Sequence, residues 1–140
     1  MRYLPAVVAA LLVASVQAQE YARYQGTWRG SFLFYVAQAD SSAQGPPAVF
    51  DGTLQIDGAG IVRGEVPEAA CRIAGSGIDF VSQANATLEL DLNGCRDARF
   101  NGHFTGRLIN NPILRYASLR LNSMRSLDAG MAQISAIIRR

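Results

Sequence analysis

Two cysteines and one histidine are the residues of this chain best suited to redox, metal or nucleophilic chemistry. Cys71 and Cys95 do not form a C-x-x-C motif, which argues against a thiol–disulfide exchange site. His103 is the only histidine, so the chain lacks the ligands of a typical zinc site. Two cysteines in an exported protein most simply form one disulfide, worth about 3 kcal/mol to the fold. We therefore predict a Cys71–Cys95 disulfide, no metal and no cofactor.

His103 lies on the polar side of a segment in which apolar and polar residues alternate. A catalytic triad needs a nucleophile and an orienting group beside the histidine, and no serine or aspartate stands out as its partner. A carboxylate pair for glycoside hydrolysis would have to come from acids spread along solvated strand faces: Glu65, Glu68, Asp79, Glu89 and Asp91. Their spacing does not require any two of them to meet. We therefore predict an exposed His103, no catalytic residues and a protein that is not an enzyme.

The first residues have the pattern of an export signal. Arg2 supplies a positive charge, an apolar run follows over Leu4–Val16, and Val16-Gln17-Ala18 places small residues at a cleavage site. The run is shorter than the roughly 20 residues of a transmembrane helix. No cysteine follows it, which disfavours a lipid anchor. We predict a signal peptide at Met1–Ala18, with an uncleaved anchor as the alternative, and one mature domain over 19–140 in the periplasm or the medium.

The mature part alternates with period two, which is typical of half-buried strands. In 87–93 the leucines Leu88, Leu90 and Leu92 alternate with polar residues, and 100–108 repeats the pattern. Turn residues such as Asp57-Gly58-Ala59-Gly60 separate the runs at intervals of roughly 8–12 residues. Strands at that spacing indicate an all-β domain, and closure removes exposed edges. We predict a small antiparallel up-and-down β-barrel of about eight strands, preceded by a signal-peptide helix.

Charge is distributed unevenly along the chain, and every basic residue is an arginine. Residues 19–95 contain four arginines and nine acids, whereas 96–140 contain eight arginines and two acids. We expect the two halves to pair their charges when they fold together. The alternative is a basic patch for an acidic partner or for phosphate headgroups. The excess is too modest, for an exported chain, to indicate nucleic-acid binding.

Gly26-Thr27-Trp28 opens the first predicted strand. This G-x-W motif resembles that of calycins, the lipocalin, avidin and bacterial protease-inhibitor barrels, although the second lipocalin motif, T-D-Y, is absent. The resemblance implies that Trp28 plugs one barrel end under an arginine from a late strand, for which Arg115, Arg120 and Arg139 are candidates. In the inhibitors the segment before the first strand enters the protease cleft. Here that segment is 19–25, with Tyr21 and Tyr24 as candidate partner contacts.

Two binding functions fit this fold, and interior volume distinguishes them. The first is a protein-binding module, such as an inhibitor or protective partner of an exported hydrolase, which uses the N-terminal segment and the polar loop over 38–47. The second is a calycin-type carrier of a small apolar ligand held by large inward side chains: Trp28, Phe32, Phe34, Phe100 and Phe104. A barrel of this size is either filled by side chains or holds one small ligand. These rings favour a filled interior, and an open apolar cavity of several hundred cubic ångströms would reverse that preference.

A small outer-membrane β-barrel is a third possibility, because it also has an export signal and alternating strands. In that case Leu88, Leu90 and Leu92 would face lipid, while Glu89 and Asp91 would line the interior. Several predicted strands are shorter than the roughly 9–11 residues that a span requires. The terminal aromatic residue typical of that family is replaced by arginine. We therefore expect no stable membrane insertion after signal cleavage.

Overall fold

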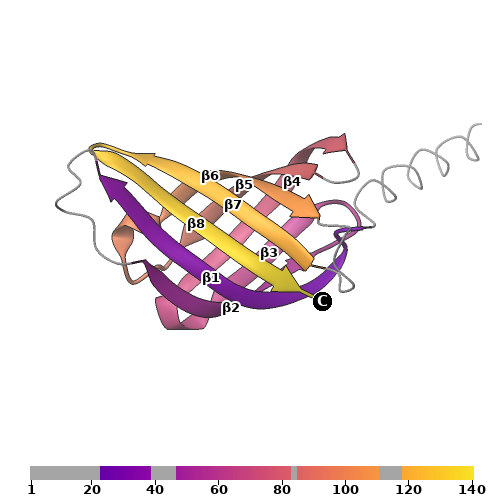
Figure 1. Cartoon of the computed structure of the whole chain (residues 1–140), viewed down its shortest axis with the longest axis horizontal. Helices are drawn as coiled ribbons and strands as arrows, with labels where there is room; N and C mark the ends of the chain where they lie inside the picture. Colours follow the sequence, from indigo (N-terminus) through magenta and orange to yellow (C-terminus); the bar gives the residue numbers. More distant parts are fainter. Residues whose placement is uncertain (1–22, 39–46, 83–84, 111–117) are drawn as a thin grey trace, which may run out of the picture.

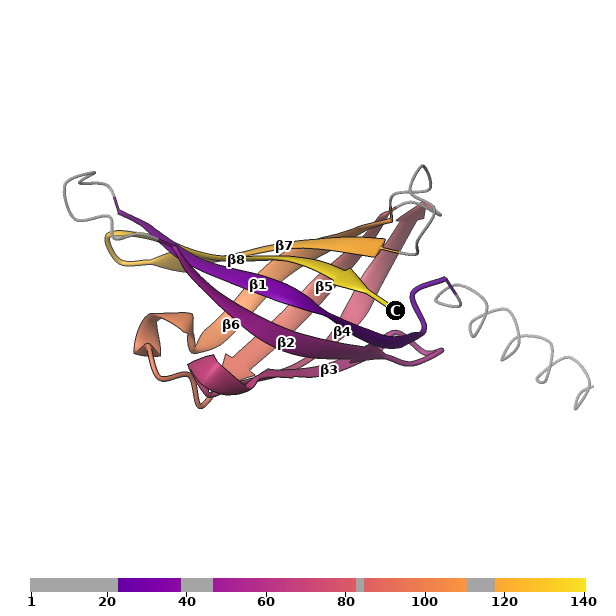
Figure 2. The ribbon, with the colours of Figure 1, turned by 60° about the horizontal axis from the view of Figure 1, so that its bottom comes forward.

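A computed structural model describes residues 23–38, 47–82, 85–110 and 118–140, with side chains outside 78–82. The predicted signal peptide at Met1–Ala18, together with Tyr21 and Arg115, lies outside the described residues, as does most of the loop over 38–47. Eight antiparallel strands close into a barrel in sequence order (Figures 1 and 2). The strands are β1 Gly26–Gln38, β2 Ala48–Ile56, β3 Ile61–Val66, β4 Cys71–Ser82, β5 Asn85–Asn93, β6 Gly102–Asn110, β7 Ser118–Leu127 and β8 Gly130–Arg139. The predicted all-β barrel is confirmed.

Most predicted strand and turn positions are confirmed, with two local differences. The composition of Gly75-Ser76-Gly77 predicts either a tight turn or a bulge; it is not a turn, because β4 continues through it, and the register with β5 shifts between Gly77 and Asp79 as at a bulge. The strand predicted from Phe100 begins at Gly102, because Ala98–Phe100 forms a 3-10 turn (η3) capped by the Asp97 carboxylate. A second such turn, η2, spans Pro67–Ala69 between β3 and β4.

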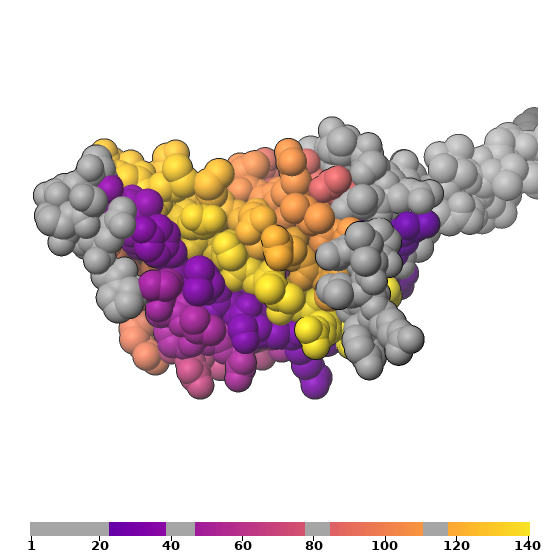
Figure 3. Space-filling view, in the orientation of Figure 1, coloured from indigo at the N-terminus to yellow at the C-terminus, as the bar shows by residue number. Residues whose placement is uncertain are grey.

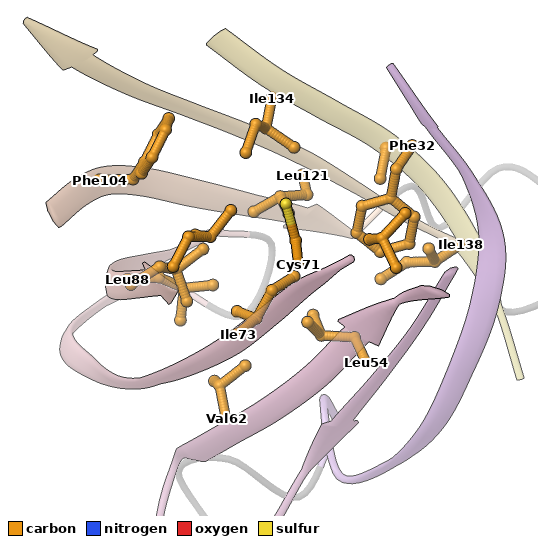
Figure 4. Packing of buried hydrophobic residues seen from close by; sticks show 14 of the residues in the cluster. Phe32, Leu54, Val62, Cys71, Ile73, Leu88, Phe104, Leu121, Ile134 and Ile138 are labelled. Atoms are coloured by element: carbon orange, nitrogen blue, oxygen red, sulfur yellow. The ribbon is translucent and has the colours of Figure 1, made fainter. Parts of the chain in front are cut away.

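The barrel interior is filled by side chains from all eight strands, as Figure 4 shows for part of the core. The five predicted interior rings are all buried: Trp28, Phe32, Phe34, Phe100 and Phe104. Glycine allows this density where strands approach closely, since a Cβ at Gly52 would lie 2.6 Å from the Phe32 ring. The leucines of β5 also point inward, at 1–3% exposure, whereas Asp91 is exposed. The outer-membrane alternative requires the opposite orientation of β5, so that orientation is wrong.

Trp28 closes the end of the barrel where β1 begins and β8 ends. Its indole N–H donates to the Tyr24 carbonyl at 2.7 Å, and the Arg140 guanidinium lies 4.6 Å from the ring centroid. Arg140 also donates to the Gln25 carbonyl at 2.8 Å and to the Arg23 carbonyl at 3.3 Å. The arginine on Trp28 is therefore neither Arg120 nor Arg139. Side chains alternate along a strand, so both of those arginines point outward, and the residue after β8 folds over the barrel end.

Tyr24 belongs to this closed end and is not a surface contact. Its side chain is 1% exposed, and burial raises the pKa of its phenol. Its carbonyl is the acceptor for the Trp28 indole. The prediction that Tyr24 meets a partner protein is wrong in this structure, because the chain turns into the barrel end immediately before β1.

Among the residues that the structure describes, the expected charge pairing between the two halves is found at His103 but not at the arginines. The ion pairs there are Arg99 with Asp97, and His103 with Glu89 and with Asp91. In this set no arginine after Cys95 forms an ion pair with an acid before Cys95. For Arg139 the barrel order explains this result, because β8 lies beside β1 and β7 and away from the acidic residues of β5.

Candidate functional site

A cavity of about 330 Å³ opens at the end of the barrel opposite Trp28, between β1, β2, η2 and η3. Its floor is formed by three phenylalanine rings, those of Phe34, Phe50 and Phe100. Smaller side chains complete its walls, among them the disulfide-bonded Cys71 and Cys95. Four charged side chains lie at its rim: Glu68, Arg96, Asp97 and Arg99. We refer to this hollow as the end cavity.

The end cavity exists because β2 is longer than its neighbour β3. Only Thr53–Ile56 of β2 pairs with β3, while the earlier residues of β2 pair with β1 alone. After Val66, the last residue of β3, the chain leaves the sheet. η2 begins there at Pro67, which lacks the N–H that a further ladder bond would need. Ala70 then adopts a left-handed conformation, with φ of 59°, that turns the chain into β4. The barrel wall is thus open beside Phe50.

One disulfide and one backbone hydrogen bond hold η2 and η3 together across the mouth of the barrel. The predicted disulfide joins Cys71 to Cys95, which are 24 residues apart in sequence. Beside it, the Arg96 N–H donates to the Ala69 carbonyl at 2.9 Å, and the Cys95 N–H donates to the Asn101 side chain at 2.9 Å. The disulfide and these hydrogen bonds therefore hold in place the backbone segments that form the walls of the end cavity. A disulfide also indicates that the domain folds in a non-cytoplasmic environment.

The three rings of the floor contact one another edge to face. The ring centroids of Phe34 and Phe100 are 4.9 Å apart with an interplanar angle of 80°, and those of Phe34 and Phe50 are 5.7 Å apart at 71°. This geometry is favourable for aromatic pairs. Phe34 and Phe100 are buried and Phe50 is half-buried, so the Phe50 ring is the more accessible part of the floor. The floor offers a rigid apolar surface for a ring or a short chain.

The rim carries two acids and two arginines, and only one pair is engaged. Arg99 donates to both carboxylate oxygens of Asp97, at 3.0 and 2.8 Å, and these bonds hold the pKa of Asp97 below its usual value. In the described part of the chain, Glu68 and Arg96 form no ion pair. Both are exposed. They are available to a polar group on a molecule whose apolar part rests on the phenylalanines.

Of the five rings predicted to hold a ligand, two lie at the end cavity and three do not. Phe34 and Phe100 line the end cavity, whereas Trp28, Phe32 and Phe104 lie in the filled part of the barrel. Sequence reasoning missed Phe50, whose alternation with the polar residues of β2 places it on the inward side. It also missed that the disulfide forms a wall of the site. The position of the cysteines, at the start of β4 and just after β5, was the available signal.

His103 is exposed, as predicted, but it has two acidic partners on the neighbouring strand. Its Nδ1 lies 3.0 Å from Asp91 Oδ1, and its Nε2 contacts Glu89. The Asp91 hydrogen bond and the Glu89 contact raise the pKa of His103 above its ordinary value. The register of β5 with β6, which places Asp91 opposite His103, creates this cluster. No nucleophile of the described chain completes a triad there, and no described group of three or more His, Cys, Asp or Glu side chains is arranged to hold a metal ion.

We expect the pKa of His103 to exceed 6.5, its ordinary value. The folded state then favours the protonated ring, so any stability from this cluster is present below about pH 6.5 and is lost as pH rises through the raised pKa. NMR titration of the imidazole protons measures this value directly. Asp91→Asn should lower it, whereas Glu65→Gln on β3 should leave it unchanged. A wild-type value at or below 6.5 would contradict the described contacts.

With the geometry established, comparison with known proteins gives no assignment. No protein-family model matches the chain, and neither does a curated protein or a solved structure. Within the described residues, no helix is both long enough and apolar enough to span a membrane.

Proposed function

We propose that this protein is an exported binding protein that holds a small amphipathic molecule in the end cavity. The observation that carries the proposal is a hollow of about 330 Å³ with three phenylalanines at its floor and, at its rim, Glu68 and Arg96, which form no ion pair with a described residue. Its volume lies at the lower end of the range for small-molecule sites. The ligand would place one ring or a short chain against Phe50 and a polar group near Arg96 or Glu68.

The cavity favours the carrier hypothesis over the inhibitor hypothesis. A filled interior was the argument for a protein-binding module, and the barrel is filled except where the end cavity opens. The N-terminal route into a protease also loses one of its two candidate contacts, because Tyr24 is buried. The calycin resemblance supports the same conclusion. Since the G-x-W tryptophan closes one end of a calycin-type barrel, a ligand of this protein would have to enter at the other end, where the end cavity lies.

Export by a signal peptide at Met1–Ala18 is part of this proposal. The apolar run and the small residues at Val16-Gln17-Ala18 support it. A disulfide in the mature domain is compatible with the periplasm or the medium, where such bonds persist. The ligand would then be met outside the cytoplasm.

The proposal predicts saturable binding of a neutral apolar fluorophore, N-phenyl-1-naphthylamine, to the mature domain over 19–140. Ala48 lines the end cavity and is exposed, so Ala48→Trp should fill the hollow without disturbing the core. We expect this substitution to weaken binding at least about tenfold, which corresponds to about 1.4 kcal/mol. Fluorescence titration, excited above the tryptophan absorption, measures the affinity.

Ala59→Trp is the matched control. Ala59 is also exposed, but it lies in the β2–β3 hairpin at the Trp28 end of the barrel. It adds the same side chain far from the end cavity, so affinity should remain at the wild-type value. Equal affinities for the Ala48 and Ala59 variants, or absence of saturable binding to the wild type, would refute the proposed function.

A further inference from the structure

Three arginines lie next to one another on the outer face of β1, β8 and β7, the side of the barrel that faces the reader in Figure 3. Arg29 on β1 is directly opposite Arg139 on β8. Arg120 on β7 is opposite Ile137, which places it diagonally next to Arg139. All three side chains are exposed. The arrangement concentrates positive charge over three neighbouring strands.

This cluster has no counterion among the described residues. None of the three arginines takes part in an ion pair there. The nearest acid in the strand register is Asp51, which is opposite Ser31 and therefore diagonal to Arg29. Like charges placed directly opposite each other across two strands are unfavourable. The Arg29–Arg139 pair is therefore a site where an external anionic group would stabilise the molecule.

A shallow hollow of about 420 Å³ adjoins these arginines on the same outer face. Its lining is mainly apolar; six of its residues are Ser31, Leu33, Val49, Arg120, Ser135 and Ile137. Val49 and Ile137 are 58% and 55% exposed, the two highest values among the large apolar side chains of the described residues. We call this hollow, together with Arg29 and Arg139, the outer groove. It crosses β2, β1, β8 and β7.

We propose that the outer groove binds an acidic, extended segment of another exported protein. Two or three Asp or Glu residues of that segment would pair with Arg29, Arg120 and Arg139, because guanidinium and carboxylate groups match in charge and geometry. One apolar side chain would cover Val49 and Ile137. Four strands spaced about 4.8 Å apart span about 14 Å, the length of roughly four extended residues.

The mixed charge around the outer groove favours a polypeptide over a membrane surface. A peptide can place its carboxylates on the arginines and one apolar side chain on Val49 and Ile137, whereas an anionic bilayer presents negative charge to the whole face. Asp51 at the border of the outer groove would also oppose an anionic lipid surface. The surface lies on the outside of the barrel and is separate from the end cavity, so this function is independent of the small-molecule site.

The experiment uses random dodecapeptides on phage, selected on the mature domain and counter-selected on Arg120→Glu/Arg139→Glu. We expect enriched peptides with at least two acidic residues beside an apolar one. Their affinity, measured by fluorescence anisotropy, should fall at least tenfold for the variant and should weaken with salt. The matched control, Arg63→Glu/Arg72→Glu, makes the same charge change on exposed residues of β3 and β4. It should change affinity less than twofold.

Several outcomes would overturn this proposal. They are failure to enrich any peptide over the counter-selected variant, enrichment of peptides without acidic residues, and equal loss of affinity in both double variants. Flotation with phosphatidylglycerol vesicles that depends on Arg120 and Arg139, without peptide binding, would identify a lipid site instead. Light scattering that shows an oligomer dissociated by the same variant would identify self-association. Binding of N-phenyl-1-naphthylamine should stay unchanged in both double variants, which confirms their fold and keeps this test separate from that of the end cavity.

Discussion

Trp28→Ala is expected to lower the free energy of unfolding by about 3–5 kcal/mol, the range for removal of a buried aromatic side chain. Trp28 is 1% exposed and closes the barrel end, so the change leaves a void that the surrounding strands cannot fill. It also removes the indole donor from the Tyr24 carbonyl and the aromatic face from Arg140. Urea denaturation of the domain over 19–140, followed by far-UV circular dichroism, measures the effect.

A double-mutant cycle separates the arginine contact from the loss of volume. Trp28→Leu keeps an apolar side chain but removes the aromatic face, and Arg140→Ala removes the guanidinium and its two bonds to backbone carbonyls. We expect a coupling energy of about 0.5–1 kcal/mol between these positions, as for an exposed cation–π contact. A loss below about 1 kcal/mol for Trp28→Ala would show that Trp28 does not close the barrel end.

The barrel itself could be predicted because the patterns that indicate it, alternation and turn residues, involve residues close together in the sequence. Alternation in β5 requires only that Leu88, Leu90 and Leu92 share one face, and turn residues divide the remaining runs at regular intervals. Short antiparallel strands in sequence then leave few arrangements without an exposed edge. The disulfide was also predictable, because two cysteines allow one intramolecular pairing. These predictions do not depend on which residue lies opposite another across two strands.

The features that sequence reasoning missed all depend on register or on chain ends. Asp91 meets His103 only because β5 and β6 pair with that alignment, and the alternation is compatible with other alignments. Arg140 reaches Trp28 because the chain leaves β8 before it, so the inward–outward rule no longer applies. The charge imbalance between the halves was visible, but pairing requires spatial proximity. The ladder order separates Arg139 of β8 from the acids of β5.

The end cavity was missed for a related reason. A count of large inward side chains indicates the volume that is filled, but it does not show where one strand extends beyond the end of its neighbour. The hollow lies where β2 continues beyond the ladder with β3 and the chain departs into η2. Phe34 and Phe100 were correctly placed inside, yet their accessibility follows from that departure. Strand lengths, rather than residue types, determined the location of the candidate site.

Removal of the disulfide, by Cys71→Ala/Cys95→Ala, is expected to lower the free energy of unfolding by about 3 kcal/mol. The bridge closes a loop between residues 24 apart in sequence, and in the chain-entropy model a loop of this length contributes about that amount. The double substitution avoids a free thiol and keeps each position apolar. Urea denaturation under non-reducing conditions measures the loss, and the barrel strands should keep their circular dichroism in the absence of urea.

The same variant tests the role of the disulfide as a wall of the end cavity. Without the bridge, η2 and η3 are linked beside the end cavity by the hydrogen bond from Arg96 to the Ala69 carbonyl, so the walls should fluctuate more. We expect N-phenyl-1-naphthylamine affinity to fall about tenfold or more at a urea concentration of zero, where the variant remains folded. A core substitution of similar cost far from the cavity, Val62→Ala, is the matched control and should retain the wild-type affinity. Equal affinity in the disulfide variant and the wild type would show that the bridge stabilises the barrel without shaping the site.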